Sequence, residues 1–231
     1  DGGGLLDGND HIIHIMSEIR DILDSSISTE VSIDGSSANR KEELFVTAIS
    51  VLWGLCAADE GRIHQAVEIG CLDPIVDIFI NQPQEPYHPE MFIWSLGALC
   101  SLAESYDVRL LLSHKGGIRG IISTLSMYES DPAIFEWACR TLYALVSCPE
   151  KETNMSQITS DHLATAEHNI SLMLESNGVV SVASAMKHHT AHPLAEWHAF
   201  RLLASLLDQS MDDSVDVVVN QLLEPQMIQT C

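Results

Sequence analysis

The sequence predicts an all-α fold in which a few similar helical units are stacked side by side. Apolar residues recur at helical spacing through most of the 231 residues, and no stretch shows convincing strand alternation. Gly-containing breaks recur along the chain at similar intervals, and the long helices between them carry matching residues. These three observations together favour a repeat architecture, in which each unit buries its apolar face against its neighbour.

The first predicted helix follows Asn9 or Asp10, either of which can serve as its N-cap. Residues 25–40 are rich in Ser, Asp and Gly and predict a flexible loop. The later helices are expected from apolar periodicity, which places Leu44, Ile49 and Leu52 on one face of the next one. We expect them at residues 41–57, 60–69, 73–80, 91–104, 107–114, 118–128, 134–147, 161–175, 179–188, 194–208 and 215–223.

The breaks between these helices have recognisable causes. Gly70 ends one helix, and Pro74 is tolerated in the first turn of the next. Residues 81–90 contain three prolines, which no helix interior accommodates, and Asp131 with the following proline makes another break. Residues 149–160 are polar and predict an insertion between two repeats.

An internal repeat appears when the long helices are aligned on their apolar residues. One position is held by Thr47, Trp94, Trp137 and Trp197, and the position five residues later by Leu52, Leu99, Leu142 and Leu202. The interval between Trp137 and Trp197 is one repeat period plus the insertion. The breaks repeat at Gly70-Cys71, Gly116-Gly117 and Asn177-Gly178. Gly suits these turns because two helices meet nearly end to side, where a Cβ would clash or φ must be positive.

Two segments carry the resemblance to a known family. Gly116-Gly117-Ile118 with Ile121, Ile122 and Leu125 matches the second-helix motif of the armadillo repeat, although Arg119 stands where that motif has Pro. Residues 134–145 match its third-helix motif. The chain therefore resembles the armadillo repeat family. The resemblance implies a single domain, residues 1–231, that forms a right-handed α-α superhelix of about four three-helix repeats with frayed ends.

The resemblance also implies which residues line a binding groove, because the third helices of armadillo proteins form the concave face. Importin alpha places Trp and, four residues later, Asn on the exposed stripe of these helices. The matching pairs here are Ser50 and Gly54, Gly97 and Ser101, Arg140 and Ala144, and Phe200 and Ala204. None of these pairs keeps the Trp–Asn combination, so nuclear-signal recognition of that type is not expected.

One turn upstream on the same stripe stand Trp94, Trp137 and Trp197. One hypothesis is a tryptophan ladder that binds an extended or helical ligand with apolar or cationic side chains. Glu104 and Asp208, near the far ends of these helices, would add acidic groups. The alternative is that the tryptophans fill gaps between adjacent third helices, as large aromatic residues at helical spacing commonly do.

The formal net charge of −22 bears on the kind of partner. Such a charge repels nucleic-acid phosphates and anionic membranes, and it favours a basic protein or peptide, unless it serves only solubility. The longest apolar run is too short to cross a membrane. We expect a non-enzymatic scaffold or adaptor that binds a basic or amphipathic protein segment. The alternative is a structural subunit bound permanently in a large assembly.

Cysteines and histidines give no clear sign of a metal or cofactor. The six cysteines form no C-x-x-C, which is typical of reduced, buried thiols and of the cytoplasm or nucleus, with an organelle matrix as a further possibility. His188, His189, His192 and His198 are close in sequence, but we expect them at the surface without a metal. A metal-dependent enzyme that uses this segment is the third hypothesis. No catalytic motif is recognisable.

Overall fold

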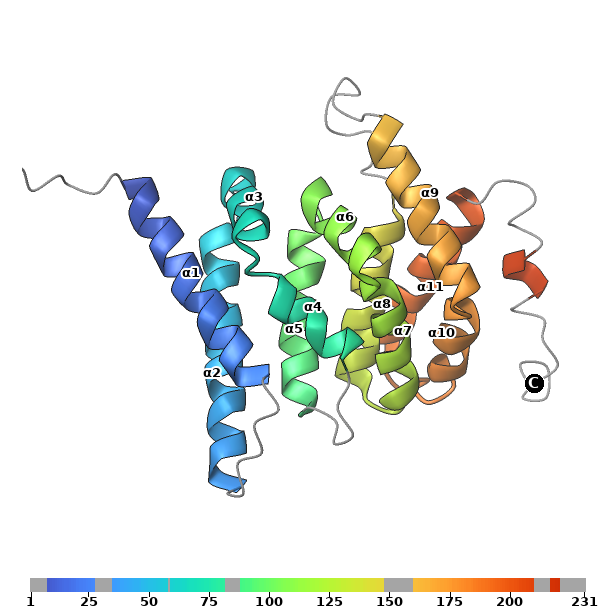
Figure 1. The fold of residues 1–231 in the computed structure, drawn as a ribbon. Coiled ribbons are helices and arrows are strands. Elements are labelled where there is room, and N and C mark those ends of the chain that lie inside the picture. Colours follow the sequence, from blue (N-terminus) through green and yellow to red (C-terminus); the bar gives the residue numbers. More distant parts are fainter. Residues whose placement is uncertain are drawn as a thin grey trace, which may run out of the picture. The chain divides into compact units, whose positions relative to one another are not determined.

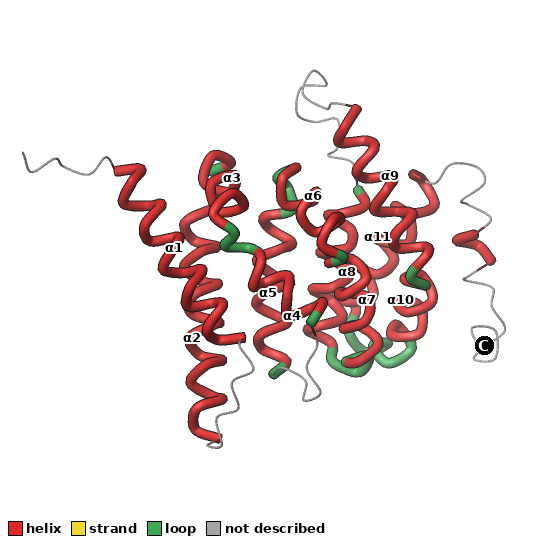
Figure 2. The backbone as a smooth tube through the Cα atoms, viewed as in Figure 1, coloured by secondary structure: helices red, strands yellow, loops and turns green. Residues whose placement is uncertain are grey.

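The computed structural model describes residues 8–27, 35–57, 59–81, 88–147, 160–209 and 217–220. All regular secondary structure in these ranges is helical, which confirms the all-α prediction (Figure 1; Figure 2). The chain divides into two compact units, residues 1–98 and 99–231, and each is described by itself. None of the helices in the described ranges is both long enough and apolar enough to cross a membrane.

The helix bounds follow the predicted ones within a few residues, with one exception. The first unit contains α1 (Gly8–Ile27), α2 (Gly35–Cys56), α3 (Glu60–Ile69), α4 (Asp73–Ile80) and most of α5 (Pro89–Leu102). The second contains the end of α5 and α6 (Tyr106–Lys115), α7 (Gly117–Met127), α8 (Pro132–Val146), α9 (Ser160–Glu175), α10 (Gly178–Met186) and α11 (Pro193–Gln209). Residues 217–220 are also helical, inside the predicted terminal helix.

The exception is the loop predicted at residues 25–40. Residues 25–27 still belong to α1, and residues 35–40 already belong to α2, so the loop prediction was wrong for both ends. Ser and Gly are weak helix formers in a helix interior, but they are tolerated near a helix N-terminus, where unpaired N–H groups are present anyway. The rest of this loop and residues 149–159 of the predicted insertion lie outside the described residues.

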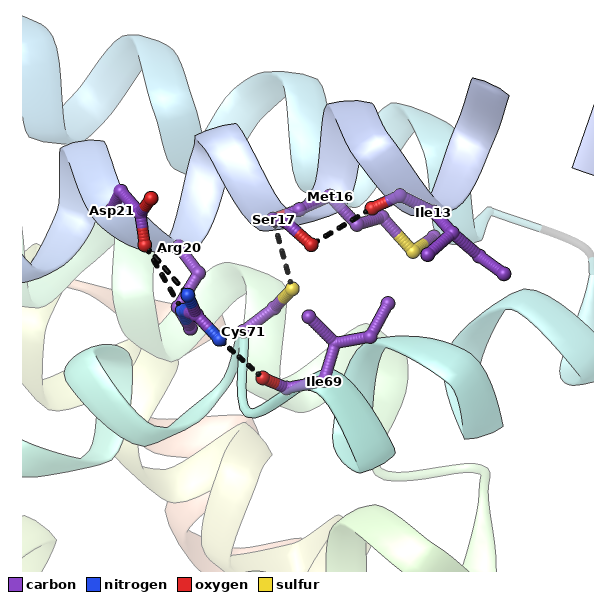
Figure 3. Close-up of polar contacts among 7 residues, drawn as sticks. All are labelled: Ile13, Met16, Ser17, Arg20, Asp21, Ile69 and Cys71. Carbon is purple, nitrogen blue, oxygen red and sulfur yellow. Dashed lines mark hydrogen bonds and ion pairs between the residues drawn. The ribbon is translucent and has the colours of Figure 1, made fainter. Parts of the chain in front are cut away.

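In the first unit, α1 packs along α2 and also contacts α3 and α4. Figure 3 shows polar contacts that fix α1 to the end of α3. Nη1 of Arg20 donates to the carbonyl of Ile69 at 3.2 Å, and the thiol of Cys71 donates to the carbonyl of Met16 at 3.2 Å. The first bond satisfies a carbonyl at the end of α3, and the second joins Cys71, just after that end, to the middle of α1. The largest fully buried side chains of this unit include Met16, Leu23, Phe45, Ile49, Leu72 and Phe79.

The predicted breaks are left-handed turns that end helices. Gly70 and Gly116 have φ values of 82° and 79°, and Asn177 has a φ of 56°. Gly117 and Gly178, one residue later, are needed for close approach. A Cβ on Gly117 would lie 2.6 Å from a methyl carbon of Leu112, and a Cβ on Gly178 would lie 2.7 Å from Cγ of Met173. Both reasons for glycine at these turns, positive φ and close packing, are therefore present.

The second unit contains two consecutive groups of three helices. The first group is α6, α7 and α8, and the second is α9, α10 and α11. Each helix contacts its counterpart: α6 contacts α9, α7 contacts α10, and α8 packs along α11 (Figure 1). Two consecutive three-helix groups of this unit therefore pair helix by helix. Its core includes Ile118, Leu125, Phe135, Leu142, Met173, Val179 and Leu202.

Three side chains at equivalent repeat positions bond the end of the preceding long helix. Arg62 of α3 donates from Nη1 to the carbonyl of Leu55 at 3.2 Å. Nε of Arg109 in α6 donates to the carbonyl of Ala103, and Nδ2 of Asn169 in α9 donates to the carbonyl of Leu145 at 3.0 Å. The spacing of these three residues follows the repeat period, including the insertion. Each one satisfies a carbonyl that the helix itself leaves unpaired.

Candidate functional site

The surface of α8 and α11 in the second unit carries a group of aromatic and arginine side chains. We call it the aromatic–arginine face. Trp197 exposes 53% of its surface and Phe200 exposes 60%. Residues three or four positions apart lie on the same side of a helix, so the face residues of α8 lie together, as do those of α11. The packing of α8 along α11 then brings these two groups of residues side by side. The face consists of Trp137, Arg140 and Tyr143 of α8 and Trp197, Phe200 and Arg201 of α11.

Both arginines of this face stack on aromatic rings. Cζ of Arg140 lies 4.0 Å from the centre of the Trp137 ring. Cζ of Arg201 lies 4.0 Å from the Tyr143 ring and 5.4 Å from the Trp197 ring, and its Nη2 donates to the Tyr143 hydroxyl at 3.1 Å. At exposed sites such stacking is worth about 0.5–1 kcal/mol per pair. Arg201 thus connects α11 to α8, and its guanidinium is held in one orientation.

The two arginines differ in their acidic partners. Nη1 of Arg140 lies 3.4 Å from Oε1 of Glu136, one turn earlier on the same helix. Arg201 has no carboxylate within ion-pair distance among the residues that the structure describes. Only four of the eleven Lys and Arg residues lie after residue 120, and two of those four are on this face. The face therefore concentrates positive charge in a strongly acidic chain.

His198 lies beneath this face and stays neutral. Its side chain is buried, and its ring makes an edge contact with Trp197, with 4.7 Å between the ring centres. Burial, followed by the positive charges of Arg140 and Arg201, lowers the pKa of His198 to about 4. A neutral imidazole suits this place, because a charged one would be repelled by the two guanidiniums.

The residues predicted to line a concave stripe are distributed over both units. Trp94 and Gly97 of α5 belong to the first unit, where Trp94 is half-buried and Gly97 is buried. In the second unit Ser101, Glu104, Ala204 and Asp208 are exposed and Ala144 is half-buried. The structure brings Trp137 and Arg140 together with Trp197 and Phe200. Trp197 is too exposed to be a core residue, whereas Trp137 is half-buried.

Sequence reasoning missed Tyr143 and Arg201, and it placed His198 at the surface. A signal for Arg201 existed, because each of the two arginines follows a tryptophan of the repeat by three or four residues. Such spacing places a cation above a ring on one helix face. Tyr143 is recognisable only from the structure, since its contact with Arg201 joins two helices that are far apart in sequence. No pattern in the sequence distinguishes buried His198 from the exposed residues beside it on α11.

A second surface feature lies in the first unit and is acidic. Glu42, Glu43, Val46 and Thr47 of α2 line a surface hollow of about 380 Å³ together with Glu90 of α5. Nδ1 of His88 lies 2.7 Å from Oε1 of Glu42. Thr47 stands at the position of the sequence repeat that is held by tryptophan in the later repeats. Three glutamates make this hollow acidic.

The histidines near residue 190 do not all lie at the surface, so that expectation was wrong for two of them. His189 exposes only 1% of its surface, stacks on Phe135 with 4.5 Å between ring centres, and has its Nε2 2.9 Å from the carbonyl oxygen of Glu129. His198 is buried under the aromatic–arginine face. Burial lowers the pKa of His189. In the described part of the chain no three His, Cys, Asp or Glu residues are grouped so as to hold a metal ion.

The described cysteines are free thiols, and three of the four are buried. Burial raises the pKa of Cys56 to about 11 and that of Cys71 to about 12, and it also raises the pKa of Cys139. A thiol with so high a pKa stays protonated near neutral pH and is a poor nucleophile. These cysteines are therefore core residues, as the sequence predicts.

The aromatic–arginine face thus combines exposed rings, oriented guanidiniums and a buried neutral imidazole on two packed helices. Its side chains are of the kinds that recur at the centres of protein–protein interfaces, where Trp, Tyr and Arg carry most of the binding free energy. Comparisons of the chain with models of known protein families, with curated proteins and with solved structures found no match in any of the three.

Proposed function

We propose that this chain is a non-enzymatic protein-binding scaffold or adaptor built from armadillo-like repeats. In this proposal α8 and α11 are third helices of adjacent repeats and line the concave side of a right-handed superhelix. The pairing of each helix in α6–α8 with its counterpart in α9–α11 supports the repeat arrangement. The left-handed turns at Gly70, Gly116 and Asn177 support it as well, because they recur at the repeat interval.

The observation that carries the proposal is the exposure of Trp197 and Phe200 one turn apart on α11. Single exposed apolar residues are common on protein surfaces, but contiguous ones beside oriented arginines are typical of interaction sites. Leu194, one turn before Trp197, exposes 56% of its surface and extends the same apolar stripe. The stripe suits an amphipathic segment that lays its apolar residues along α11.

The charge of the partner is a separate question. The net charge of −22 and the hollow lined by Glu42, Glu43 and Glu90 favour basic groups in the first unit. The aromatic–arginine face carries the opposite charge. An amphipathic protein segment is the partner class consistent with the apolar stripe itself, whichever charges accompany it.

The test is selection of binders from a random peptide display library with the full chain as bait. Dissociation constants of the selected peptides are then measured by fluorescence anisotropy for the parent chain, Trp197→Ala and Phe200→Ala. We expect at least one family of peptides whose affinity falls about tenfold or more in both variants, since truncation of a central aromatic anchor typically costs more than 1 kcal/mol.

Met127→Ala is the matched control. Met127 of α7 is 45% exposed, and this substitution removes an apolar side chain of comparable exposure that lies outside the face. Its peptide affinity should stay within about twofold of the parent value. The proposal is wrong if no selected peptide depends on Trp197 or Phe200. A chain that instead associates with itself through this face, in a way that Phe200→Ala abolishes, would favour the structural-subunit alternative.

A further inference from the structure

We propose that the aromatic–arginine face binds an acidic, apolar peptide segment of a partner protein. In this arrangement partner carboxylates pair with Arg201 and Arg140 while apolar partner side chains cover Trp197 and Phe200. The inference rests on the proposed protein-binding function and adds the chemistry of the partner. It departs from the basic partner that the net charge of the whole chain favours.

Arg201 carries the strongest part of the argument. Cζ of its guanidinium lies 4.0 Å from the centre of the Tyr143 ring, and its Nη2 donates to the Tyr143 hydroxyl at 3.1 Å. A guanidinium has five N–H donors, so most of them stay available, and a carboxylate matches two at once. No described carboxylate pairs with it. A cation that is oriented, solvent-accessible and without an acidic partner among the described residues is suited to an anion from outside.

Arg140 contributes a second, weaker position. Its side chain is 35% exposed, and among the described residues its acidic contact is Glu136 at 3.4 Å. A close charge-assisted bond would be about 2.7–2.9 Å, so this pair is loose and Arg140 can share its donors with a further carboxylate. The ring of Trp137 at 4.0 Å holds the guanidinium in place. Arg201 contacts Tyr143, which lies one turn after Arg140 on α8, so the two arginines are in the same part of the face.

The exposed apolar rings of the face indicate which kind of anionic partner fits, an acidic peptide or a nucleic acid. Trp197 and Phe200 expose more than half of their surfaces beside Arg201. A segment that carries Leu, Ile or aromatic residues between its carboxylates would bury these rings, at roughly 25 cal/mol for each Å² of apolar area removed from water. Single-stranded nucleic acid could also stack on the rings, but the charge of −22 opposes an approaching phosphate chain far more than a peptide with two or three carboxylates.

A basic segment fits this face poorly. Its lysines or arginines would lie beside Arg140 and Arg201, and like charges in contact lower the affinity. The acidic residues that could compensate are scarce on the face itself, since Glu136 is already beside Arg140. The two arginines therefore predict an acidic segment at this face, although the net charge of the whole chain favours a basic partner.

The experiment uses the full chain and the peptides selected on it by random peptide display. For each peptide that requires Trp197 and Phe200, the dissociation constant is measured for the parent, Arg201→Gln, Arg140→Gln and the double variant. We expect these peptides to be enriched in Asp and Glu, to bind about tenfold more weakly in the double variant, and to lose affinity as salt is raised.

Arg119→Gln is the matched control, because it removes the same charge from α7, where Arg119 pairs with Glu175 at 3.2 Å. It should leave the affinity within about twofold of the parent value. Circular dichroism of each variant checks that the fold is kept, and Arg201→Lys, which retains the charge, should recover part of the affinity.

Two results would overturn the acidic-segment proposal while leaving the protein-binding function intact: enrichment of basic peptides, and affinity that depends on Trp197 and Phe200 but not on the arginines. A second copy of this chain as the occupant in sedimentation measurements would overturn the proposal and favour the structural-subunit alternative. Tight, Arg201-dependent binding of oligo(dT) would replace the peptide by a nucleic acid. If no selected peptide depends on Trp197 or Phe200, the proposed function itself fails.

Discussion

Arg109 of α6 donates from Nη1 to the carbonyl of Ser147 at 2.7 Å, and through this bond it joins the end of α8 to the end of α5. Its Nε donates to the carbonyl of Ala103, just beyond α5. Only 7% of its surface is exposed. A single buried guanidinium thus satisfies carbonyls at two helix ends, where no backbone N–H is available.

Replacing Arg109 by Met should destabilise the chain by about 2–4 kcal/mol, because two buried carbonyls lose their donors. The free energy of unfolding is measured by urea denaturation. Arg119→Met is the control, since its exposed ion pair with Glu175 should be worth less than about 1 kcal/mol. Equal losses in the two variants would show that Arg109 does not hold these helix ends together.

The second prediction concerns Asn177, whose φ of 56° lies in the left-handed region that Gly70 and Gly116 occupy at the equivalent turns. Asn177→Gly should stabilise the chain by up to about 1 kcal/mol, because glycine adopts this conformation without the Cβ penalty. The reverse change, Gly116→Asn, should destabilise it by a similar amount. The melting temperatures of both variants are compared with that of the parent, and a fall for Asn177→Gly contradicts the prediction.

These turns show how much of the fold the sequence predicts. Gly70, Gly116 and Asn177 have a strong local preference for left-handed or turn conformations, and the apolar residues between them have helical spacing. Helix ends near them were therefore predicted within a few residues. The start of α2 was missed because Ser and Gly at residues 35–37 are equally compatible with a loop and with the first turn of a helix.

The candidate site was predictable only in part. Trp137 and Trp197 were predicted as a pair because they hold the same position in the internal sequence pattern, and α8 and α11, which carry them, pack along each other. The contact of Arg201 with Tyr143 depends on the relative rotation of α8 and α11, which no single-helix pattern contains. The burial of His189 likewise depends on Phe135, which lies 4.5 Å away, ring centre to ring centre, on a helix more than forty residues earlier.

The third prediction separates exposed from buried aromatic residues. Trp197→Ala should cost less than about 1 kcal/mol of stability, because the ring is 53% exposed and leaves no cavity. Phe135→Ala should cost about 3–5 kcal/mol, because that ring is fully buried. Urea denaturation measures both. Iodide quenching of the parent's fluorescence should fall when Trp197 is removed, and a large stability loss in Trp197→Ala would make this residue part of the core.

The fourth prediction is a pH dependence of stability that originates at His198. Its folded pKa of about 4 lies below the ordinary value of 6.5, so the unfolded chain binds more protons between these two pH values. The stability that the neutral ring provides is fully present above pH 6.5. It is lost as the pH falls through this window, and the loss is complete below about pH 4. Solvent screening keeps the change to about 1–2 kcal/mol.

His198→Gln isolates this contribution, because the carboxylates that titrate in the same range are common to the parent and the variant. Between pH 7 and pH 4 the unfolding free energy of the parent should fall by more than that of His198→Gln. The imidazole signals in NMR spectra give the pKa directly. Arg201→Gln should move the pKa of His198 upward, since it removes one of the two positive charges that oppose protonation, although burial remains the larger cause. An unchanged pKa in Arg201→Gln would mean that the guanidinium does not lie beside the ring.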